Sequence, residues 1–287
     1  MQAETRERRP LAPDPSPRDA RMAQKDDKLV LGELPKRRAE LLTEPPPGLR
    51  VSLVAPVYDE EDNLRPLYDS VVEVFGEGDD WELVLVDDGS RDGSPALLQQ
   101  LCDEDPRVVG VFFAENCGQT AAMGTGIQLA RGELIATLDS DLQNDPADIP
   151  KLIAELGDND AVVGYRQKRN DNAVRRSSSR IANRVRNWIS KDQIIDTGCS
   201  LKVFRAEAIQ AIPLFEGMHR FFPTLLRYHG FSVIERPVSH RPRVAGVSKY
   251  GVMNRAWRAF KDLLAVRWMH GRMIRVPIAR VSGRDDA

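Results

Sequence analysis

Two carboxylates one residue apart end a short apolar run near the middle of the sequence. Asp139 and Asp141 follow residues 134–138, and Gln143 comes two positions later. Unpaired charge inside a strand is costly, so we place these side chains beyond the carboxyl end of a strand, where they reach a crevice. Two carboxylates and an amide oxygen suit a hard divalent cation with sites left for phosphate oxygens. For a lone pair of this kind, a polar loop after a strand is the favoured alternative.

Two more acidic clusters follow predicted strands. Asp59-Glu60 comes after residues 50–58, and Asp87-Asp88 comes after residues 81–86. Because parallel strands end at one edge of their sheet, three such clusters converge on one crevice, which favours a binding site over a polar loop. No G-x-G-x-x-G follows the first strand, so a dinucleotide site is excluded. A pyrophosphate here needs a bridging metal or contacts to its base and ribose.

Strands and helices alternate around these clusters. Further strands are predicted at residues 108–113, 134–138 and 160–164, and helices at 64–75, 95–102, 118–130 and 147–156. In the third helix, Gly124 and Gly126 permit close packing or the approach of a ligand. Short connections between alternating elements predict an α/β fold with a mostly parallel, Rossmann-like sheet flanked by helices.

Length and composition limit what surrounds this domain. With 287 residues, 41% of them hydrophobic, the chain can bury one sizeable core plus appendages. Residues 1–48 are rich in proline and charge, which predicts a disordered tail. Three cysteines without paired spacing predict a reducing compartment. No signal-like start and no run of about 20 apolar residues is present. We therefore expect a cytoplasmic protein, at most peripheral on a membrane.

The net charge of −2 conceals two halves of opposite sign. Residues 161–287 hold 25 Lys and Arg against 9 Asp and Glu, whereas the first 160 residues hold 16 against 34. A basic half favours an anionic partner such as phosphates, lipid headgroups or nucleic acid, although ordinary solvated surface is the alternative. Nucleic acid is disfavoured because aromatic interleaving and a recognisable module are missing.

Two basic segments carry apolar stripes at helical spacing. One includes Val174, Ile181, Val185 and Trp188, and the other runs from Met253 to Met269 within residues 251–287. Basic amphipathic helices with tryptophan at the boundary suit a membrane interface. Stripes that simply cover the sheet are the alternative.

Six motifs carry a family resemblance. They occur in order over residues 51 to 250: Ala55–Glu60, Val86–Ser94, Asn116–Ala122, Leu138–Pro146, Asp196–Phe204 and Gly246–Tyr250. Together they resemble glycosyltransferase family 2, with its GT-A fold, and within it the polyprenyl-phosphate sugar transferases. The dolichol-phosphate mannosyltransferase and bactoprenol glucosyltransferase groups are the most similar. The GT-A domain is accordingly predicted over residues 49–250.

The resemblance implies an activity and a role for each matched residue. The activity is metal-dependent, inverting transfer of a hexose from a UDP- or GDP-sugar to a polyprenyl phosphate, with Mg²⁺ or Mn²⁺ as cofactor. Base and ribose contacts are implied for Pro56, Tyr58, Glu60 and Asp88. Metal coordination at the diphosphate is implied for Asp139, Asp141 and Gln143. Phosphate contacts are implied for Arg166 and for a mobile loop with Arg241, Arg243, Ser248 and Lys249. Asp59 stands where the family commonly has Asn, which puts ribose or base contacts in doubt.

The acceptor decides whether a base is needed. A hydroxyl acceptor requires a general base, whereas a phosphate monoester, with a second pKa near ~6, is already largely ionised. Cationic candidates to hold it are Arg175, Arg176, Arg180, Arg241, Arg243 and Lys249. Asp196 is the candidate base or acceptor-positioning residue, and a turn or N-cap role before Thr197-Gly198 is its alternative.

The expected partners follow from this activity. They are a nucleotide-sugar donor, a polyprenyl phosphate and the cytosolic face of a membrane, reached as a peripheral protein or through an integral membrane partner. Two rival functions stay open: transfer to a hydroxyl of a glycan, protein or small molecule, and non-catalytic nucleotide binding. The intact set Asp139, Asp141 and Gln143 argues against the second rival.

Overall fold

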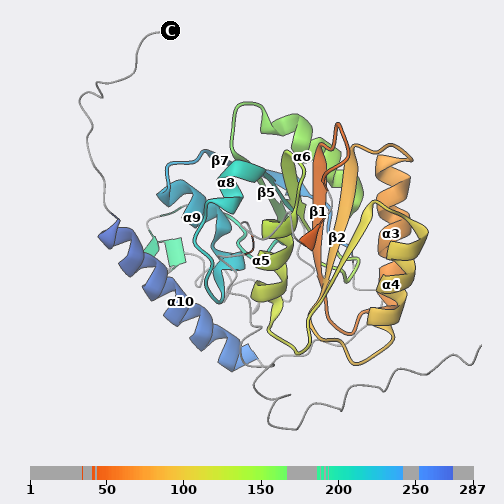
Figure 1. Ribbon diagram of the computed structural model, residues 1–287. Helices are drawn as coiled ribbons and strands as arrows, with labels where there is room; N and C mark the ends of the chain where they lie inside the picture. The colour runs from red at the N-terminus through yellow and green to blue at the C-terminus, as the bar shows by residue number, and fades with distance from the viewer. Residues whose placement is uncertain are drawn as a thin grey trace, which may run out of the picture.

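A seven-stranded mixed sheet forms the centre of the protein (Figure 1), with strand order β3-β2-β1-β4-β6-β5-β7. The computed structural model describes residues 44–166, 194–241 and 252–273, together with residues 34, 41, 42, 186, 187, 189, 190 and 192. The predicted disordered tail therefore lies mostly outside the described residues, and so does the predicted mobile loop apart from Arg241. In the described part of the chain, every helix is too short or too polar to cross a membrane.

Four parallel strands make up one half of the sheet: β1 (Val51–Val57), β2 (Trp81–Asp87), β3 (Val108–Phe112) and β4 (Leu134–Thr137). β1 and β2 consist largely of Val and Leu and are buried along their length, as expected for strands covered on both faces. Pro56 is tolerated because β4 pairs with β1 only as far as Val54. On the β4 side, the pairing therefore requires no N–H from Pro56.

The other half of the sheet contains β5 (Ala161–Arg166), β6 (Lys202–Arg205) and β7 (Val233–Val238). β6 lies antiparallel between β4 and β5, and its first residue, Lys202, pairs with Thr137 at the end of β4. The segment that precedes β6 therefore reaches the edge at which the parallel strands end. Neither β6 nor its direction was predicted, although the mostly parallel sheet is confirmed.

Helices cover both faces of the sheet. One face carries α3 (Glu61–Phe75), α4 (Ser94–Glu104) and α6 (Ile149–Leu156), preceded by the 3₁₀ turn η2 (Pro146–Asp148). The other carries α5 (Gln119–Leu129), α8 (Ala206–Gln210), α9 (Phe222–Tyr228) and α10 (Val252–Arg272), with the 3₁₀ turn η3 (Met218–Arg220). Each strand and helix predicted between residues 50 and 164 is present. Only its ends differ, as where β5 continues through Arg166.

Two local packing details explain how the elements approach the site. A side chain at Gly126 would place its Cβ 2.4 Å from Val54, so this glycine lets α5 lie close against β1, as predicted. Ser94, which begins α4, accepts a hydrogen bond from the backbone N–H of Glu60 at 2.9 Å. That contact joins the end of β1 to the start of α4 and fixes the loop after the first strand.

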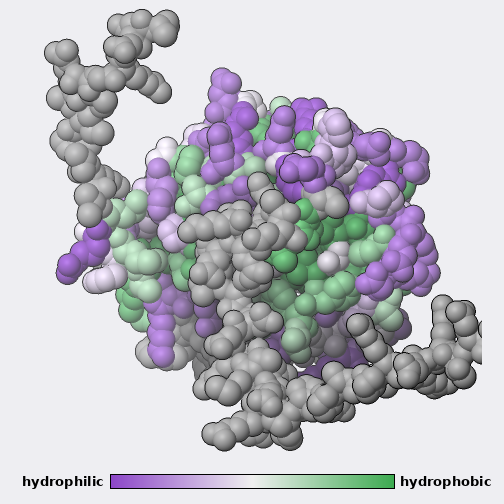
Figure 2. All heavy atoms as spheres, in the orientation of Figure 1, coloured by the Kyte–Doolittle hydropathy of each residue, from purple (hydrophilic) through white to green (hydrophobic). Residues whose placement is uncertain are grey.

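Helix α10 runs along the outside of the molecule (Figure 1). Leu263 and Val266 are buried against the core, whereas Phe260, Leu264 and Trp268 are exposed. The predicted apolar stripe is therefore divided: part of it covers the body, and part faces outward. In Figure 2, hydrophobic and hydrophilic surfaces alternate along the left edge, where α10 lies, while hydrophilic surface dominates over α3 and α4. The other predicted stripe, at residues 174–188, lies almost wholly outside the described residues.

Candidate active site

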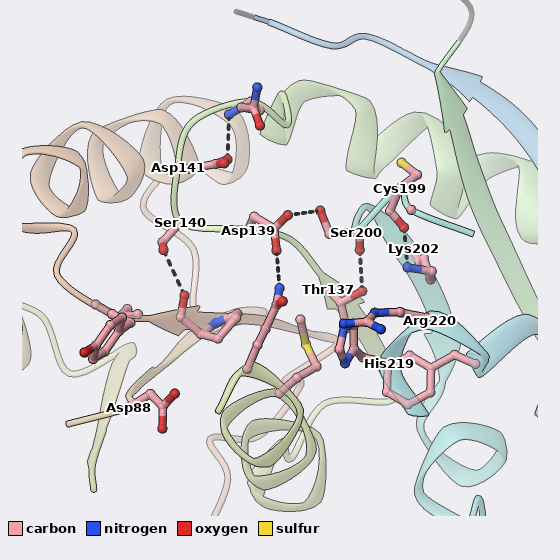
Figure 3. Close-up of a pocket in the computed structure, with 18 of the residues that line it drawn as sticks. Asp88, Thr137, Asp139, Ser140, Asp141, Cys199, Ser200, Lys202, His219 and Arg220 are labelled. Carbon is pink, nitrogen blue, oxygen red and sulfur yellow. Dashed lines mark hydrogen bonds between the residues drawn. The ribbon is translucent and has the colours of Figure 1, made fainter. Parts of the chain in front are cut away.

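A cavity of about 640 Å³ opens at the carboxyl edge of the sheet. It is lined from β1, β2 and β4, from the segment before β6, and from η3 (Figure 3). The predicted residues that line it are Pro56, Tyr58, Glu60, Asp88, Asp139, Asp141, Gln143 and Arg166. We call Glu60, Asp88, Asp139 and Asp141 the carboxylate wall, and Arg166, Lys202 and Arg220 the cationic wall. The predicted convergence of the strand ends is thus present.

Asp139 occupies the centre of the cavity lining. Its Oδ2 accepts a hydrogen bond from Ser200 Oγ at 2.7 Å, and its Oδ1 accepts one from Gln119 Nε2 at 3.1 Å. Burial raises the pKa of Asp139; the Ser200 hydrogen bond opposes this rise, and the negative charge of Asp141 adds to it. A cation between the two carboxylates would relieve both the burial and the repulsion.

The loop from Asp139 to Asn144 holds the second carboxylate in place. Asp141 is 6% exposed, and its Oδ1 accepts the backbone N–H of Gln143 at 3.2 Å. Leu142 adopts a left-handed conformation with φ of 60°, which is uncommon for a residue with a branched side chain. Asn144 Oδ1 closes the loop by accepting the N–H of Asp139 at 3.2 Å. The turn thereby directs both carboxylates to one cavity.

These side chains fit a divalent cation of the hard type. Within the described ranges, no group of three or more His, Cys, Asp and Glu is arranged to hold a metal. Mg²⁺ in nucleotide sites commonly uses one or two carboxylates and takes its other ligands from water and phosphate. Asp139 and Asp141, with the amide of Gln143, supply that donor chemistry on a cavity with room for a substrate.

Asp88 links the end of β2 to the start of α5. It is 3% exposed, and its carboxylate accepts the N–H groups of Cys117 at 2.6 Å and Gly118 at 2.9 Å, and the amide of Asn116 at 2.9 Å. Burial raises the pKa of Asp88, while the backbone N–H groups of Cys117 and Gly118 oppose that rise. The residue therefore shapes the pocket as well as lining it.

The loop after β1 supplies the remaining carboxylate. Glu60 lines the cavity and accepts a hydrogen bond from Asn63 Nδ2 at 2.5 Å. Asp59, in contrast, does not line it: its Oδ1 accepts the N–H of Arg91 at 2.8 Å. Its φ of 50° is one that Asn and Asp adopt more readily than most residues. Asp in place of Asn at this position is therefore accommodated by the turn, away from the cavity.

Arg166 and Asp196 form a bidentate ion pair. Arg166 Nε donates to Asp196 Oδ2 at 2.7 Å, and Nη2 donates to Oδ1 at 2.9 Å. Arg166 lines the cavity, whereas Asp196 lies behind it and is 7% exposed. Asp196 also accepts the N–H of Gly198 at 3.1 Å, which closes the turn. The geometry is that of a carboxylate that fixes a guanidinium and a turn together.

Lys202 places a buried ammonium beside the carboxylate wall. It is 3% exposed, and its Nζ donates to the backbone carbonyl of Cys199. Burial lowers the pKa of Lys202, while the negative charge of Asp139 is among the groups that raise it. Ser200, two residues earlier, contacts Asp139, and its own carbonyl accepts Thr137 Oγ1 at 2.7 Å. The antiparallel start of β6 thus meets the end of β4 at the site.

His219 and Arg220 line the cavity from η3 (Figure 3). His219 Nδ1 lies 2.7 Å from Thr120 Oγ1, and Thr120 also accepts the N–H of Gly217 at 3.1 Å. Sequence reasoning missed both residues, because η3 belongs to none of the matched motifs. It also missed Gln119 and Lys202, although these lie inside motifs that were matched.

Several predicted residues lie outside the site or outside the described residues. Arg243, Ser248 and Lys249 fall in 242–251, and Arg175, Arg176 and Arg180 fall in 167–185; all six are outside the described residues. Arg241 is described and does not line the cavity. Its N–H donates to the carbonyl of Gln143 at 2.9 Å, and its guanidinium pairs with Asp145. Arg241 thus connects the end of the described segment to the loop that carries Asp141.

Comparison with known proteins gives consistent matches. The family described as Glycosyl transferase family 2 matches residues 52–212. Dodecaprenyl-phosphate galacturonate synthase of Rhizobium johnstonii is 40% identical over 230 residues, which are 78% of this chain and 68% of that protein. Undecaprenyl-phosphate 4-deoxy-4-formamido-L-arabinose transferase of Shewanella sediminis is 38% identical over 71% of this chain. The chain spans only 62% of that second relative.

Solved structures share the fold. Mannosyltransferase PcManGT from Pyrobaculum calidifontis, in complex with GDP-Man and Mn²⁺, has a TM-score of 0.57 at 20% identity and covers 86% of this chain and 78% of its own. Glucosyl-3-phosphoglycerate synthase from Mycobacterium tuberculosis, in complex with Mg²⁺ and UDP, has a TM-score of 0.60 at 16% identity and covers 84% of both chains. The predicted GT-A architecture is confirmed.

Proposed function

Because the chain belongs to glycosyl transferase family 2, we propose that it transfers a hexose from a nucleotide sugar to a polyprenyl phosphate at the cytosolic face of a membrane. One observation carries the proposal: a single cavity has a carboxylate wall on the strand ends of β1, β2 and β4 and a cationic wall on β5, β6 and η3. Two relatives named for transfer to dodecaprenyl and undecaprenyl phosphates support the acceptor class.

The carboxylate wall is assigned to the donor. Pro56, Tyr58, Glu60 and Asp88 lie at the ends of β1 and β2, where a base and ribose would bind. Asp139, Asp141 and Gln143 would hold Mg²⁺ or Mn²⁺ against the diphosphate. Bound there, the metal would stabilise the negative charge of the departing nucleoside diphosphate. The solved structures with this fold contain GDP-Man or UDP, which supports a nucleotide donor as a class. Their likeness to this chain is limited to the fold, so they do not select the nucleotide.

The cationic wall is assigned to phosphate chemistry. Asp196 binds the guanidinium of Arg166 through two hydrogen bonds, which orients the guanidinium before substrate binds. A phosphate monoester is already largely ionised near neutral pH, so this acceptor needs cations more than it needs a base. Its oxygen would attack the anomeric carbon while the diphosphate departs from the opposite side, with inversion.

The direct experiment is a transfer assay. Purified protein is incubated with radiolabelled UDP- and GDP-hexoses, polyprenyl phosphate and Mn²⁺, and label is measured in the organic phase after extraction. We expect a lipid-linked product whose formation a chelator abolishes and added Mn²⁺ restores. Absence of product with every donor, or product formation that survives chelation, would contradict the proposed reaction.

A hydroxyl acceptor is the second candidate, and Asp196 separates the two. If Asp196 were the base, Asp196→Asn would lower the rate by the 100- to 10,000-fold typical of general base catalysis. Both of its oxygens are bound by Arg166, which supports a positioning role. We therefore expect a loss on the order of tenfold, with an unchanged pH profile of the turnover number.

Contact with the bilayer is assigned to α10. Phe260, Leu264 and Trp268 lie one helical turn apart on its outer side and are 38%, 46% and 64% exposed. Arg272 lies over the Trp268 ring at 5.5 Å, so a cation sits beside the most exposed aromatic side chain. Exposed apolar residues flanked by cations suit an interface with anionic lipid. Trp268→Ala should weaken sedimentation with phosphatidylglycerol vesicles several-fold, whereas Trp81→Phe in the core should not.

A further inference from the structure

Helix α10 carries one acidic residue, Asp262, among five basic ones: Arg255, Arg258, Lys261, Arg267 and Arg272. Asp262 is 26% exposed and lies on the side of the helix that meets the body. Its neighbours in sequence differ: Lys261 is exposed, and Leu263 is buried in the core. The only carboxylate in a basic helix is thus directed toward the protein, and the turn it meets is the one that forms a wall of the cavity.

That turn is η3 with the glycine before it. Asp262 Oδ2 lies 4.0 Å from Arg220 Nη1, and Arg220 lines the cavity. Gly217 has φ of +85°, and a Cβ on it would come within 2.5 Å of Asp262 Oδ2. The carboxylate therefore lies close to both ends of η3: the glycine that precedes the turn and the arginine that ends it.

The opposite side of η3 is held by α5. Thr120 accepts the N–H of Gly217 and contacts His219. The turn is only three residues long, so it has few internal hydrogen bonds to define its shape. Its position depends on α5 from one side and α10 from the other. Leu263 and Val266 anchor α10 beside Asp262 in the same core cluster as Phe221 and Phe222, which follow η3.

We propose that Asp262 is a positioning residue for sugar transfer: it holds η3 so that Arg220 presents its guanidinium to the substrate in the cavity. This inference rests on the proposed function for its kinetic consequence, but the contact itself does not. The same helix presents Phe260, Leu264 and Trp268 outward. Helix α10 would thereby complete the active site from its inner side and meet the bilayer with its outer side.

Asp262→Asn is the test, because it removes the charge and keeps the shape. We expect the turnover number to fall about tenfold, between the few-fold effect of an exposed ion pair and the roughly 100-fold cost of misplacing a substrate-binding group. The KM for the nucleotide sugar should change less than twofold if Arg220 acts on the reacting groups. Lys261→Gln, the neighbouring substitution, is the matched control and should leave both constants unchanged.

Two further variants separate positioning from general destabilisation. The double variant Asp262→Asn, Arg220→Gln should have the same turnover number as Arg220→Gln alone, because each substitution removes the same interaction between residues 262 and 220. Gly217→Ala places a Cβ against Asp262 Oδ2, so it disturbs the same contact and should reproduce the kinetic defect. Additive losses in the double variant, or wild-type kinetics in Asp262→Asn, would overturn the proposal.

Hydrogen exchange tests the contact without any activity. In Asp262→Asn, the amides of residues 217–221 should exchange at least several-fold faster, while those of β1 and β2 and the melting temperature stay unchanged. If wild-type protein forms no lipid-linked sugar, the proposed function fails while this exchange result can still support the contact. Unchanged exchange at 217–221 would overturn the proposal even in an active enzyme.

Discussion

The two walls of the cavity are built in different ways. The carboxylate wall comes from the loops after β2, β1 and β4, which are neighbouring parallel strands, so each residue follows a short apolar run in the sequence. The cationic wall comes from the end of β5, the start of antiparallel β6 and the turn η3. Its residues share no local sequence pattern. One wall is therefore a property of strand ends, and the other is a property of how the second half of the chain folds back.

The walls also differ in how their charges are held. Asp139 and Asp141 both face the cavity, and burial raises the pKa of Asp139. A bound cation would neutralise the repulsion between them. Arg166 has its counter-charge built in, because Asp196 binds it through two hydrogen bonds. In the proposed function the first wall would be completed by a bound cation, whereas Arg166 in the second is already oriented by Asp196. The following substitutions test that contrast.

The largest effect is expected at Asp141. Asp141→Asn should lower sugar transfer at least about 100-fold, the scale seen when one group that stabilises transition-state charge is removed. It should also remove the rise in melting temperature caused by Mn²⁺ and nucleotide, because a ligand stabilises only the state that binds it. Asp103→Asn on α4, where Asp103 accepts a hydrogen bond from Gln99 Nε2 at 2.9 Å, is the control. A Mn²⁺-dependent shift equal to that of wild type would contradict the metal assignment.

An intermediate effect is expected at Asp88. Asp88→Ala leaves the N–H groups of Cys117 and Gly118 without their acceptor, so the free energy of unfolding should drop by about 2–3 kcal/mol. Nucleotide binding should weaken as well, because the start of α5 loses its anchor. Asp105→Ala removes an equally buried carboxylate, bound by Arg107 and Tyr68 far from the cavity. It should cost similar stability in urea denaturation yet leave nucleotide affinity unchanged; equal affinity losses would refute a site role for Asp88.

The smallest effect on stability is expected at Lys202. Lys202→Met removes a buried charge and one hydrogen bond, so the free energy of unfolding at pH 7 should change by no more than about 1 kcal/mol, although transfer should fall. Burial lowers the pKa of Lys202 in the folded state, so the folded protein is penalised while the amine is charged.

The pH dependence of this variant has a definite sign. Between the lowered pKa of folded Lys202 and its ordinary value of 10.5, the unfolded chain binds more protons, so wild-type stability rises with pH. Between pH 7 and pH 10, the free energy of unfolding of wild type, measured by urea denaturation, should therefore rise relative to that of Lys202→Met. Lys151→Met, at a lysine that is 70% exposed, serves as the surface control. A difference that stays constant or moves the other way would contradict the buried charge.

Local patterns predicted the first half of the fold closely. Residues 50–58 and 81–86 are predicted as strands because segments rich in Val and Leu end at acidic loops, and the structure places them as β1 and β2. The boundaries near the loops were less accurate, as at Arg166, which ends β5 and had been placed after it. Hydrophobic runs specify that a strand exists, whereas its last residue depends on the neighbour with which it pairs.

The sequence by itself determined the carboxylate wall. Parallel strands end at a common edge, so residues that follow apolar runs meet whatever their order in the sheet, and Glu60, Asp88, Asp139 and Asp141 could be assigned to one crevice. In the cationic wall only Arg166 was predicted, and the tertiary structure decided Lys202 and Arg220. The direction of β6 brings Lys202 beside Thr137, and the packing of α10 places Asp262 at η3. Both depend on contacts between segments far apart in the chain, which no local spacing encodes.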